Sequence, residues 1–593
     1  MVTSIMVHKK EGWKEELYGD EVREKIEEFA ERGWESIPDD EREKWFSRFK
    51  FWGVFHHRSG QESYFMMRLT NCGGLLEPGQ LRAIGEVADE YASGPVDNPE
   101  FGDAWIDFTT RQSVQLHWLK LEDIPAIWEK LESVGVSSRS AGGDTMRNIS
   151  GCPVAGKADE YVESRGLLDD IQEGIRGDDD LANMPRKFNI SVSGCRQGCA
   201  QDSINDVGLE PAHRLIDGED VRGFNVRVGG GLGGREPRRA RSLDLFVTPD
   251  QAYETVRTFV EYYHREGNRQ NRSKNRARFF VDETGVEEIR EAMVERLSFD
   301  PEHAGTDFRR EYTYNAGRSS EYGAHDHVGV YDQADGTNYV GLSIPVGRLA
   351  AGKVLELADL ADEYGSGEVR LTRRQNPLIM DVPDDRLDAL LDEPFLETYS
   401  PDSNPFVQGA MACTGTEFCS LALTETKARM ARMLPWLRDN VELPDDVDRI
   451  KIHYSGCTAD CGQAMTADIG LQGMRAQKND EMVEALDVGV GGGVGEEPSF
   501  IEWARQRVPA DEVPGLIRNL VGAYAALREE GQTFREWVDA TGQGAIVELA
   551  EPEEVEGYED PCLYDGKQSW YPFDDGESPA PTSAEGAPLE ADD

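Results

Sequence analysis

The chain has 593 residues, 113 acidic against 63 basic side chains, and a formal net charge of −50. At roughly 100–200 residues per domain, this length predicts three to five domains with large cores. The charge argues against a nucleic-acid partner, because binding phosphates needs a basic face. No uncharged apolar run approaches the roughly 18 residues of a membrane span, which excludes an integral membrane protein.

The basic residues are mostly arginine, with 47 Arg against 16 Lys. Dispersed acids with few lysines are typical of proteins from salt-rich cytoplasms, where a Debye length of about 3 Å at molar salt screens self-repulsion. Acid-rich disorder is the alternative, but 11 Trp, 22 Phe and 19 Tyr favour folded cores. The first residues also contain no apolar signal-peptide core, so we expect a cytoplasmic protein.

The two ends of the chain differ from its middle. Residues 1–45 predict a charged helical arm, in which Val22, Ile26 and Phe29 follow helical spacing. Residues 551–593 are rich in Pro, Ser, Ala and acids and predict a surface wrap or a disordered tail.

The middle contains an internal repeat. Cys195 and Cys199 in SGCRQGC are echoed by Cys457 and Cys461 in SGCTADC, 262 residues later. DVGL and VGGG in the first half are echoed at the same offset by DIGL and VGGG, and TRQ at 110–112 is echoed by RRQ at 373–375. Order and spacing are both kept, which indicates one duplicated module rather than a solenoid of short repeats.

Each half mixes strand and helix signals. Residues 188–193 and 224–228 alternate as half-buried strands do, whereas residues 251–264 and 513–527 carry apolar residues at helical spacing. We therefore predict an α+β fold whose two halves are related by a pseudo-twofold axis, with a site at their interface. The predicted domains are an arm (1–45), a first half-domain (46–135), a first site domain (136–300), a second half-domain (320–400), a second site domain (401–550) and a tail (551–593).

Four cysteines of the second half form two close pairs. They are Cys413, Cys419, Cys457 and Cys461. Four such thiolates can hold a [4Fe–4S] cluster or a tetrahedral zinc ion. The spacing C-x5-C…C-x3-C is unusual for zinc and favours the cluster, with unligated buried cysteines as the remaining alternative.

Several motifs together resemble the nitrite and sulfite reductase haemoprotein family. They occur in the family's order between about residues 45 and 550, and they are TTRQ at 109–112, RN at 147–148, PRKFN at 185–189, TRRQNP at 372–377, ACTGTEFC at 412–419 and the Cys457–Cys461 pair. The resemblance implies ferredoxin-like half-domains, a sirohaem and a [4Fe–4S] cluster, with Cys461 as the thiolate shared by the cluster and the haem iron. It also implies a six-electron reduction of an oxyanion.

The resemblance further implies an anion pocket made by the first half. Matching positions are Arg111, Arg147 and Lys187, and arginine and lysine suit oxyanion binding and proton supply. Arg374 is the repeat equivalent of Arg111 and is a candidate for contact with the haem. Asn189 stands where sulfite-reducing relatives tend to carry a second lysine. One cation fewer suits the monoanion nitrite, so Asn189 favours nitrite over sulfite.

The glycine-rich sequence VGGGLGG at 228–234 fits the dinucleotide fingerprint G-x-G-x-x-G. Its repeat twin, with Glu496 at the third glycine position, argues against that function. We interpret Gly230 and Gly231 instead as parts of a loop whose backbone N–H groups approach the sirohaem carboxylates. Arg186, Arg276 and Arg278 are candidate cationic partners of those carboxylates.

Three cysteines of the first half, Cys152, Cys195 and Cys199, correspond to the cluster cysteines. A second cluster would need a fourth ligand, and Cys72 is the nearby candidate in sequence. The alternative, which we favour here, is that they are relics of duplication packed as small apolar residues.

No flavin or nicotinamide domain remains once the repeat is assigned. We therefore expect a separate electron donor, and the resemblance implies ferredoxin, acting on a monomeric enzyme that produces ammonium from nitrite. The alternatives are an assimilatory sulfite reductase and, in a different class, a non-catalytic iron–sulfur or zinc protein.

Overall fold

The computed structural model describes residues 9–560 apart from residues 59–60, 62, 99–100, 158–159, 196, 235, 308–326, 448, 496–497 and 559. Most of the predicted tail, together with Cys562, lies outside these residues. No helix in the described part combines the length and apolar character needed to cross a bilayer.

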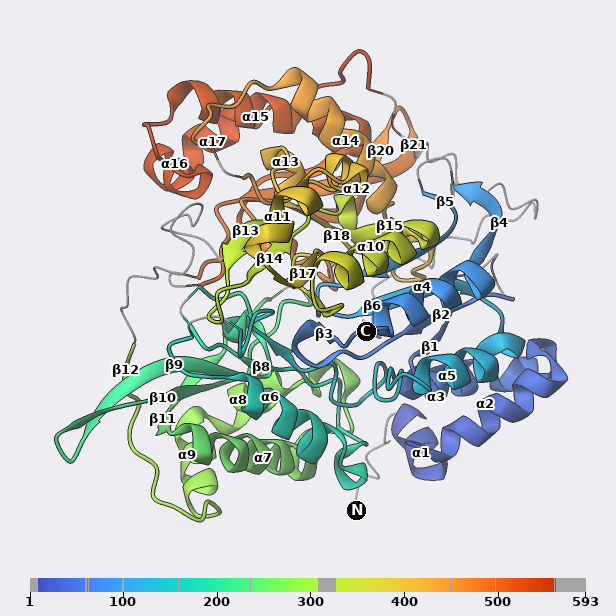
Figure 1. Ribbon diagram of the computed structural model, residues 1–593, viewed down its shortest axis with the longest axis vertical. Helices are drawn as coiled ribbons and strands as arrows, with labels where there is room; N and C mark the ends of the chain where they lie inside the picture. Colours follow the sequence, from blue (N-terminus) through green and yellow to red (C-terminus); the bar gives the residue numbers. More distant parts are fainter. Residues whose placement is uncertain are drawn as a thin grey trace.

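The N-terminal arm is helical and folded onto the first half-domain. It comprises α1 (Lys9–Glu16), α2 (Glu21–Arg32) and α3 (Arg42–Phe49), which lie beside α5 (Ile124–Glu132) in Figure 1. Val22, Ile26 and Phe29 of α2 are buried in the same apolar core as the strands of that half-domain. The spacing of these three residues therefore predicted both the helix and its buried face.

Two similar sheets form the half-domains, and each receives one strand from the other half. The first has the order β1 (Val54–His56), β2 (Phe65–Arg68), β6 (Val114–Leu119), β5 (Gly102–Phe108) and β15 (Arg348–Ala350). The second has the order β13 (Gly329–Asp332), β14 (Asn338–Gly341), β17 (Pro377–Val382), β16 (Val369–Leu371) and β3 (Leu75–Leu76). β15 and β3 are thus exchanged between the halves, and one apolar core runs through both half-domains.

The half-domains also share a pair of packed helices, α4 (Gln80–Tyr91) and α10 (Ala351–Tyr364). A Cβ at Gly85 would lie 2.8 Å from Leu355 Cδ2, which is closer than carbon atoms pack. Glycine at this position therefore lets the two helices approach closely.

The two remaining sheets have the same order and strand directions. One runs β7 (Ser150–Gly151), β8 (Ile190–Val192), β9 (Val207–Ile216), β10 (Glu219–Val228) and β11 (Arg241–Val247). The other runs β18 (Ala410–Ala412), β19 (Ile452–Ser455), β20 (Ile469–Lys478), β21 (Glu481–Val490) and β22 (Glu502–Pro509). In both sheets, the first three strands run parallel to one another, and each of the last two strands is antiparallel to the strand before it. This repetition confirms the predicted α+β class and the duplication.

Long helices cover these sheets where periodicity predicted them. α7 (Pro249–Glu266) contains the predicted residues 251–264, and α15 (Val513–Leu527) coincides with the second prediction. The other elements are β4 (Ser93–Asn98), α6 (Arg165–Ile171), α8 (Ala277–Thr284), α9 (Val286–Val294), β12 (Thr306–Asp307), α11 (Asp384–Leu391), α12 (Pro394–Thr398), α13 (Pro405–Gln408), α14 (Lys427–Asn440), α16 (Phe534–Thr541) and α17 (Gln543–Leu549).

A reciprocal amide pair joins the two halves at equivalent positions of the repeat. Gln201 Nε2 donates to Gln463 Oε1 at 2.8 Å, and Gln463 Nε2 donates back to Gln201 Oε1 at 2.7 Å. Both residues are buried and both have a positive φ, 57° and 59°. The pair therefore lies on the pseudo-twofold axis, where equivalent residues meet.

Candidate active site

A cavity of about 310 Å³ lies between the halves and is lined by side chains of both. All four second-half cysteines reach it: Cys413, Cys419, Cys457 and Cys461. The predicted anion-binding residues of the first half, Arg111, Arg147, Lys187 and Asn189, line it as well. The fold therefore brings together two sets of residues that are separated by more than 200 positions in the sequence.

The cysteines are positioned by the ends of two neighbouring parallel strands. Cys413 follows β18, and Cys457 and Cys461 lie in the turn that follows β19. The N–H of Gly456 donates to Cys413 Sγ at 3.1 Å, so the two turns are linked. Burial, and then the neighbouring Cys461, raises the pKa of Cys413 to about 11. Burial likewise raises the pKa of Cys457, and the other three thiols add to this effect.

The anion-binding residues come from turns that precede or join strands. Arg111 lies in the tight turn between β5 and β6, where Gln112 has a φ of 57°. Its Nη1 donates to Asn189 Oδ1, and the backbone N–H of Asn189 donates to Asp206 Oδ2 at 2.9 Å. The side chain of Asn189 is therefore held beside the guanidinium of Arg111.

Arg147 is held by the backbone around it. Its N–H donates to Phe188 O at 2.9 Å, next to Lys187, and its Nη2 donates to Gly143 O at 2.9 Å. These contacts fix the guanidinium relative to the segment that carries Lys187.

The cavity is cationic, although the protein as a whole is acidic. Its basic lining residues are Lys50, Arg68, Arg111, Arg147, Lys187, Arg276, Arg373 and Lys427, and its acidic ones are Asp107 and Asp460. Burial, followed by the nearby charge of Arg276, lowers the pKa of Arg111 to about 10. Burial and then Arg111 and Arg276 hold the pKa of Lys187 well below its usual value. Burial is the larger cause of both shifts and the neighbouring cations add to it, and a bound anion would offset both effects by stabilising the charged forms.

Arg276 is the predicted haem-carboxylate partner that lines the cavity. It stands at the start of α8, and its Nη2 donates to both carboxylate oxygens of Asp206, at 3.1 and 3.0 Å. Its Nε is buried and has no hydrogen-bond partner among the described residues. Arg276 is thus oriented by Asp206 and keeps a donor for a ligand.

The other three predicted arginine partners lie outside the cavity lining. Arg186 Nη1 donates to Asp144 Oδ1 at 3.2 Å, and Asp144 is also bound by Arg272. Arg278 Nη1 donates to Glu236 O at 3.3 Å, and Arg374 Nη1 lies 2.6 Å from His453 Nε2. These arginines have partners within the protein, which the sequence motifs alone did not reveal.

The glycine-rich loop after β10 does not have its predicted role, which was to approach the sirohaem carboxylates with its backbone N–H groups. The N–H groups of Gly229, Gly230 and Gly231 already donate to the carbonyls of Asp206, Asn205 and Arg238, at 2.9, 2.8 and 2.9 Å. They are therefore not available to carboxylates of a ligand, although Gly231 itself lines the cavity. The loop leads to the antiparallel strand β11 and not to a helix, which also rules out a dinucleotide-binding turn here.

Several residues that line the cavity were not predicted from the sequence. Arg373 donates to Thr110 O at 3.2 Å and to Ala200 O at 2.7 Å, and burial followed by Arg111 lowers its pKa to about 9. Thr110 Oγ1 donates to Cys461 O at 3.1 Å. The repeat could have indicated Arg373, since it aligns with Thr110 beside Arg111. No repeat position or motif indicated that Arg68 and Lys427 would line the cavity.

Both kinds of domain match families of known proteins. Residues 142–300 and 403–556 match the family described as "Nitrite and sulphite reductase 4Fe-4S domain". Residues 57–97, 99–134 and 331–394 match "Nitrite/Sulfite reductase ferredoxin-like half domain". These segments cover most of the chain and both of its halves.

Individual relatives agree with these matches. The chain is 68% identical to the assimilatory ferredoxin-dependent nitrite reductase of Haloferax mediterranei, over 97% of this chain and 99% of that protein. It is 36% identical to the ferredoxin–nitrite reductase of Synechococcus elongatus, over 88% of this chain and 97% of that one. Among solved structures, the NirA protein of Mycobacterium tuberculosis matches with a TM-score of 0.80 and 28% identity, over 91% of this chain and 97% of that one.

Proposed function

The chain belongs to the family of nitrite and sulphite reductases, and we propose that it is a ferredoxin-dependent nitrite reductase that forms ammonium. The observation that carries the proposal is the single cavity in which four cysteines of one half face the cationic residues of the other. A protein that only carries electrons does not need a buried anion pocket, so this pocket argues against the non-catalytic alternative.

The residues present fit a [4Fe–4S] cluster and a sirohaem. Cys413, Cys419, Cys457 and Cys461 would hold the cluster, since four thiols at one cavity are the donor set that such clusters use. Cys461 is proposed as the thiolate shared with the haem iron. The Nε of Arg276, which has no hydrogen-bond partner among the described residues, and the excess of cations in the cavity suit a macrocycle that carries many carboxylates. When bound, these groups supply an iron that takes the anion and a store for electrons delivered singly.

The protein's own contribution is to bind nitrite and to supply protons. Arg111 and Arg147 provide positive charge in the cavity between the halves, where charge–charge interactions are stronger than in water, and Lys187 adds to it when protonated. Reduction of nitrite to ammonium takes up six electrons and eight protons. A lysine whose pKa is depressed by burial and then by neighbouring cations gains a proton more readily once an anion is present. Lys187 can therefore hold a proton at Nζ beside the bound anion.

Asn189 is proposed as the residue that favours nitrite over sulfite. It lines the cavity, it is buried, and its amide oxygen accepts from Arg111. A lysine at this position would add a third charge next to Arg111 and Lys187. The neutral amide suits a monoanion, because an uncompensated buried charge is costly.

We further propose ferredoxin as the electron donor, a monomeric state and a cytoplasmic location. The donor is supported by the two ferredoxin-dependent relatives named above.

The proposal is tested by turnover with chemically reduced ferredoxin, with nitrite and sulfite compared side by side in high salt. We expect ammonium from nitrite and a much lower rate of sulfide formation from sulfite. A preference for sulfite would contradict the substrate assignment, and a visible spectrum without haem absorption would contradict the cofactor assignment.

A further inference from the structure

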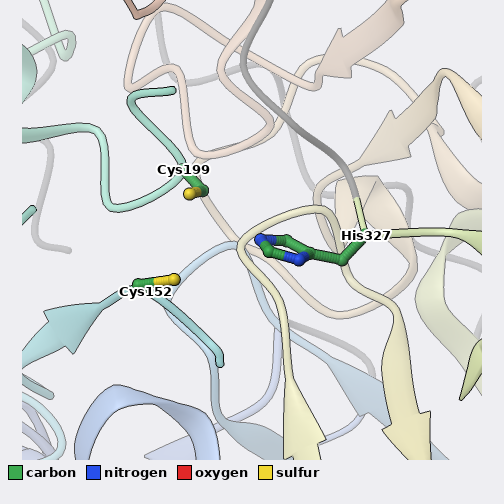
Figure 2. Close-up of side chains that lie close together, drawn as sticks. All are labelled: Cys152, Cys199 and His327. Atoms are coloured by element: carbon green, nitrogen blue, oxygen red, sulfur yellow. The ribbon is translucent and has the colours of Figure 1, made fainter. Parts of the chain in front are cut away.

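A second group of potential metal ligands lies in the first half, outside the cavity. One ligand atom each of Cys152, Cys199 and His327 lies within 4.8 Å of the other two. Figure 2 shows the three side chains arranged around one small space, with the Cys152 thiol and the imidazole edge turned toward each other. Cys152 and His327 are buried, and Cys199 is half-buried.

A third thiol stands next to this group. The Cys199 thiol is in hydrogen-bonding contact with Cys152 and also with Cys195, which is 2% exposed. Cys195 is not within 4.8 Å of all three ligand atoms and adjoins the group through Cys199, so it is the candidate fourth donor to two sulfurs and one imidazole nitrogen. Three cysteines with one histidine are an established ligand set of structural zinc sites.

The duplication explains why ligands gather here. Cys152 directly follows β7, as Cys413 directly follows β18, and Cys195 follows β8, as Cys457 follows β19. Cys199 stands 262 residues before Cys461. The first half thus repeats three of the four cluster ligands at equivalent places in an equivalent sheet.

The fourth position differs between the halves. Lys157 stands 262 residues before Cys419, and its Nζ binds the carboxylate of Asp381 at 2.8 and 3.0 Å. His327, which lies just before β13, reaches Cys152 and Cys199 from the other half. Its Nδ1 is 3.0 Å from the Tyr339 hydroxyl. A contact of this kind orients a metal-binding imidazole and leaves Nε2 to act as the ligand atom. Cys72, considered above as a fourth ligand, instead contacts Leu168 O and Arg165.

The spacing of the donors distinguishes one ion from a cluster. Ligands at zinc distances of about 2.0–2.3 Å in tetrahedral geometry lie about 3.5–3.8 Å apart. The ligand atoms of Cys152, Cys199 and His327 are already within 4.8 Å of one another and need only a small adjustment to reach that spacing, whereas Cys195, which contacts Cys199, must move closer to the others. In the described part of the chain, no three of the cluster cysteines Cys413, Cys419, Cys457 and Cys461 are this close together, as expected for thiolates on separate irons.

We propose that Cys152, Cys195, Cys199 and His327 bind one structural zinc ion, distinct from the iron centres. The ion would join the first half, which supplies the thiolates, to the start of the second half-domain, which supplies the imidazole. In this proposal the cysteines act as ligands, whereas the sequence favours small apolar packing residues.

The test is the metal content of the holoenzyme, purified in high salt without added metal or chelator. We expect about one zinc per chain beside about five irons, four of them from the cluster and one from the haem. Cys152→Ser, Cys199→Ser and His327→Gln should each lose the zinc and keep the iron. Cys72→Ser is the matched control and should keep both, whereas Cys413→Ser should lose iron and keep zinc.

X-ray absorption at the zinc edge of the unmodified protein gives a readout that does not depend on variants. We expect three sulfurs at about 2.3 Å and one nitrogen at about 2.0–2.1 Å. Less than about a tenth of a zinc per chain, or a shell of oxygen and nitrogen only, would overturn the proposal. So would retention of zinc in both Cys199→Ser and His327→Gln, or a loss of about four irons in Cys199→Ser, which would indicate a second cluster.

Discussion

Arg186 and Lys187 are adjacent in sequence but have different surroundings. Lys187 lines the cationic cavity, whereas Arg186 binds Asp144 outside the lining. Lys187→Met should lower kcat/KM for nitrite about a hundredfold, because a fixed charge at the reacting anion is lost. Arg186→Met is the matched control. It should lower the melting temperature while kcat/KM stays within a few-fold of the unmodified enzyme. Equal losses of kcat/KM in the two variants would contradict our assignment of Lys187 to the anion pocket.

The substrate preference can be tested at Asn189. Asn189→Lys adds a charge beside Arg111 and should raise the ratio of sulfite to nitrite turnover by about 10–100-fold, which corresponds to about 1–3 kcal/mol of extra attraction for a dianion. Asn189→Leu, which removes the amide without adding charge, should lower nitrite turnover and leave the ratio near its original value. The assays should be run at several pH values, since burial can keep the new lysine neutral. A ratio that is unchanged at every pH would show that residue 189 does not select the substrate.

The segment just before α14 contains a buried acid, Glu425, that lies near other acids. Glu425 Oε1 accepts from the N–H of Ala428 at 3.1 Å, and its backbone carbonyl accepts from Arg429. Burial, and then the nearby Glu417, raises the pKa of Glu425 to about 7; Glu484 adds to this shift and Arg348 opposes it. The folded protein therefore holds this proton more tightly than the unfolded chain does.

This shift gives the stability a pH dependence of known sign. Below about pH 4.5 Glu425 is protonated in both states, and above about pH 7 it is ionised in both, so stability falls between these values as pH rises. Glu425→Gln keeps the acceptor for Ala428 and removes the charge. It should raise the free energy of unfolding by about 3 kcal/mol at pH 8 and by much less at pH 5. Thermal unfolding at the two pH values checks this, and an equal gain at both would refute it.

For the whole molecule, the net charge of −50 predicts a strong dependence of stability on salt. Lowering NaCl from about 3 M to about 0.2 M lengthens the Debye length and restores repulsion between surface acids. The melting temperature should fall by about 5–10 °C. Sucrose strengthens burial without screening charge, so it should restore only a small part of the loss. Full restoration by sucrose would show that charge screening is not the cause.

The repeat and the long helices could be predicted from sequence, because both are periodic signals. Residues 251–264 and 513–527 show one apolar face, and the cysteine turns recur at a fixed offset. Arg68 and Lys427 could not be predicted as cavity residues, because they reach it from separate elements through tertiary packing. His327 was missed for the same reason, since Cys152 and Cys199, which lie close to it, are more than 120 residues away in sequence. Arg186 and Arg374 show a different limit, since each motif position also has a partner inside the protein that the sequence did not indicate, and their contact with the haem stays a prediction.

The reciprocal pair of Gln201 and Gln463 has a consequence for the origin of the fold. An amide that donates to and accepts from its own equivalent is self-complementary, which is the geometry of an interface between identical subunits. The exchanged strands β15 and β3 fit the same history, because swapping an element is a common route from monomer to dimer. Both features fit a homodimeric ancestor that became a single chain by gene fusion. The chain divided between residues 317 and 318 and expressed as two polypeptides should then assemble in the cell and restore nitrite turnover. Gln201→Glu together with Gln463→Glu should abolish that complementation by placing two like charges on the axis.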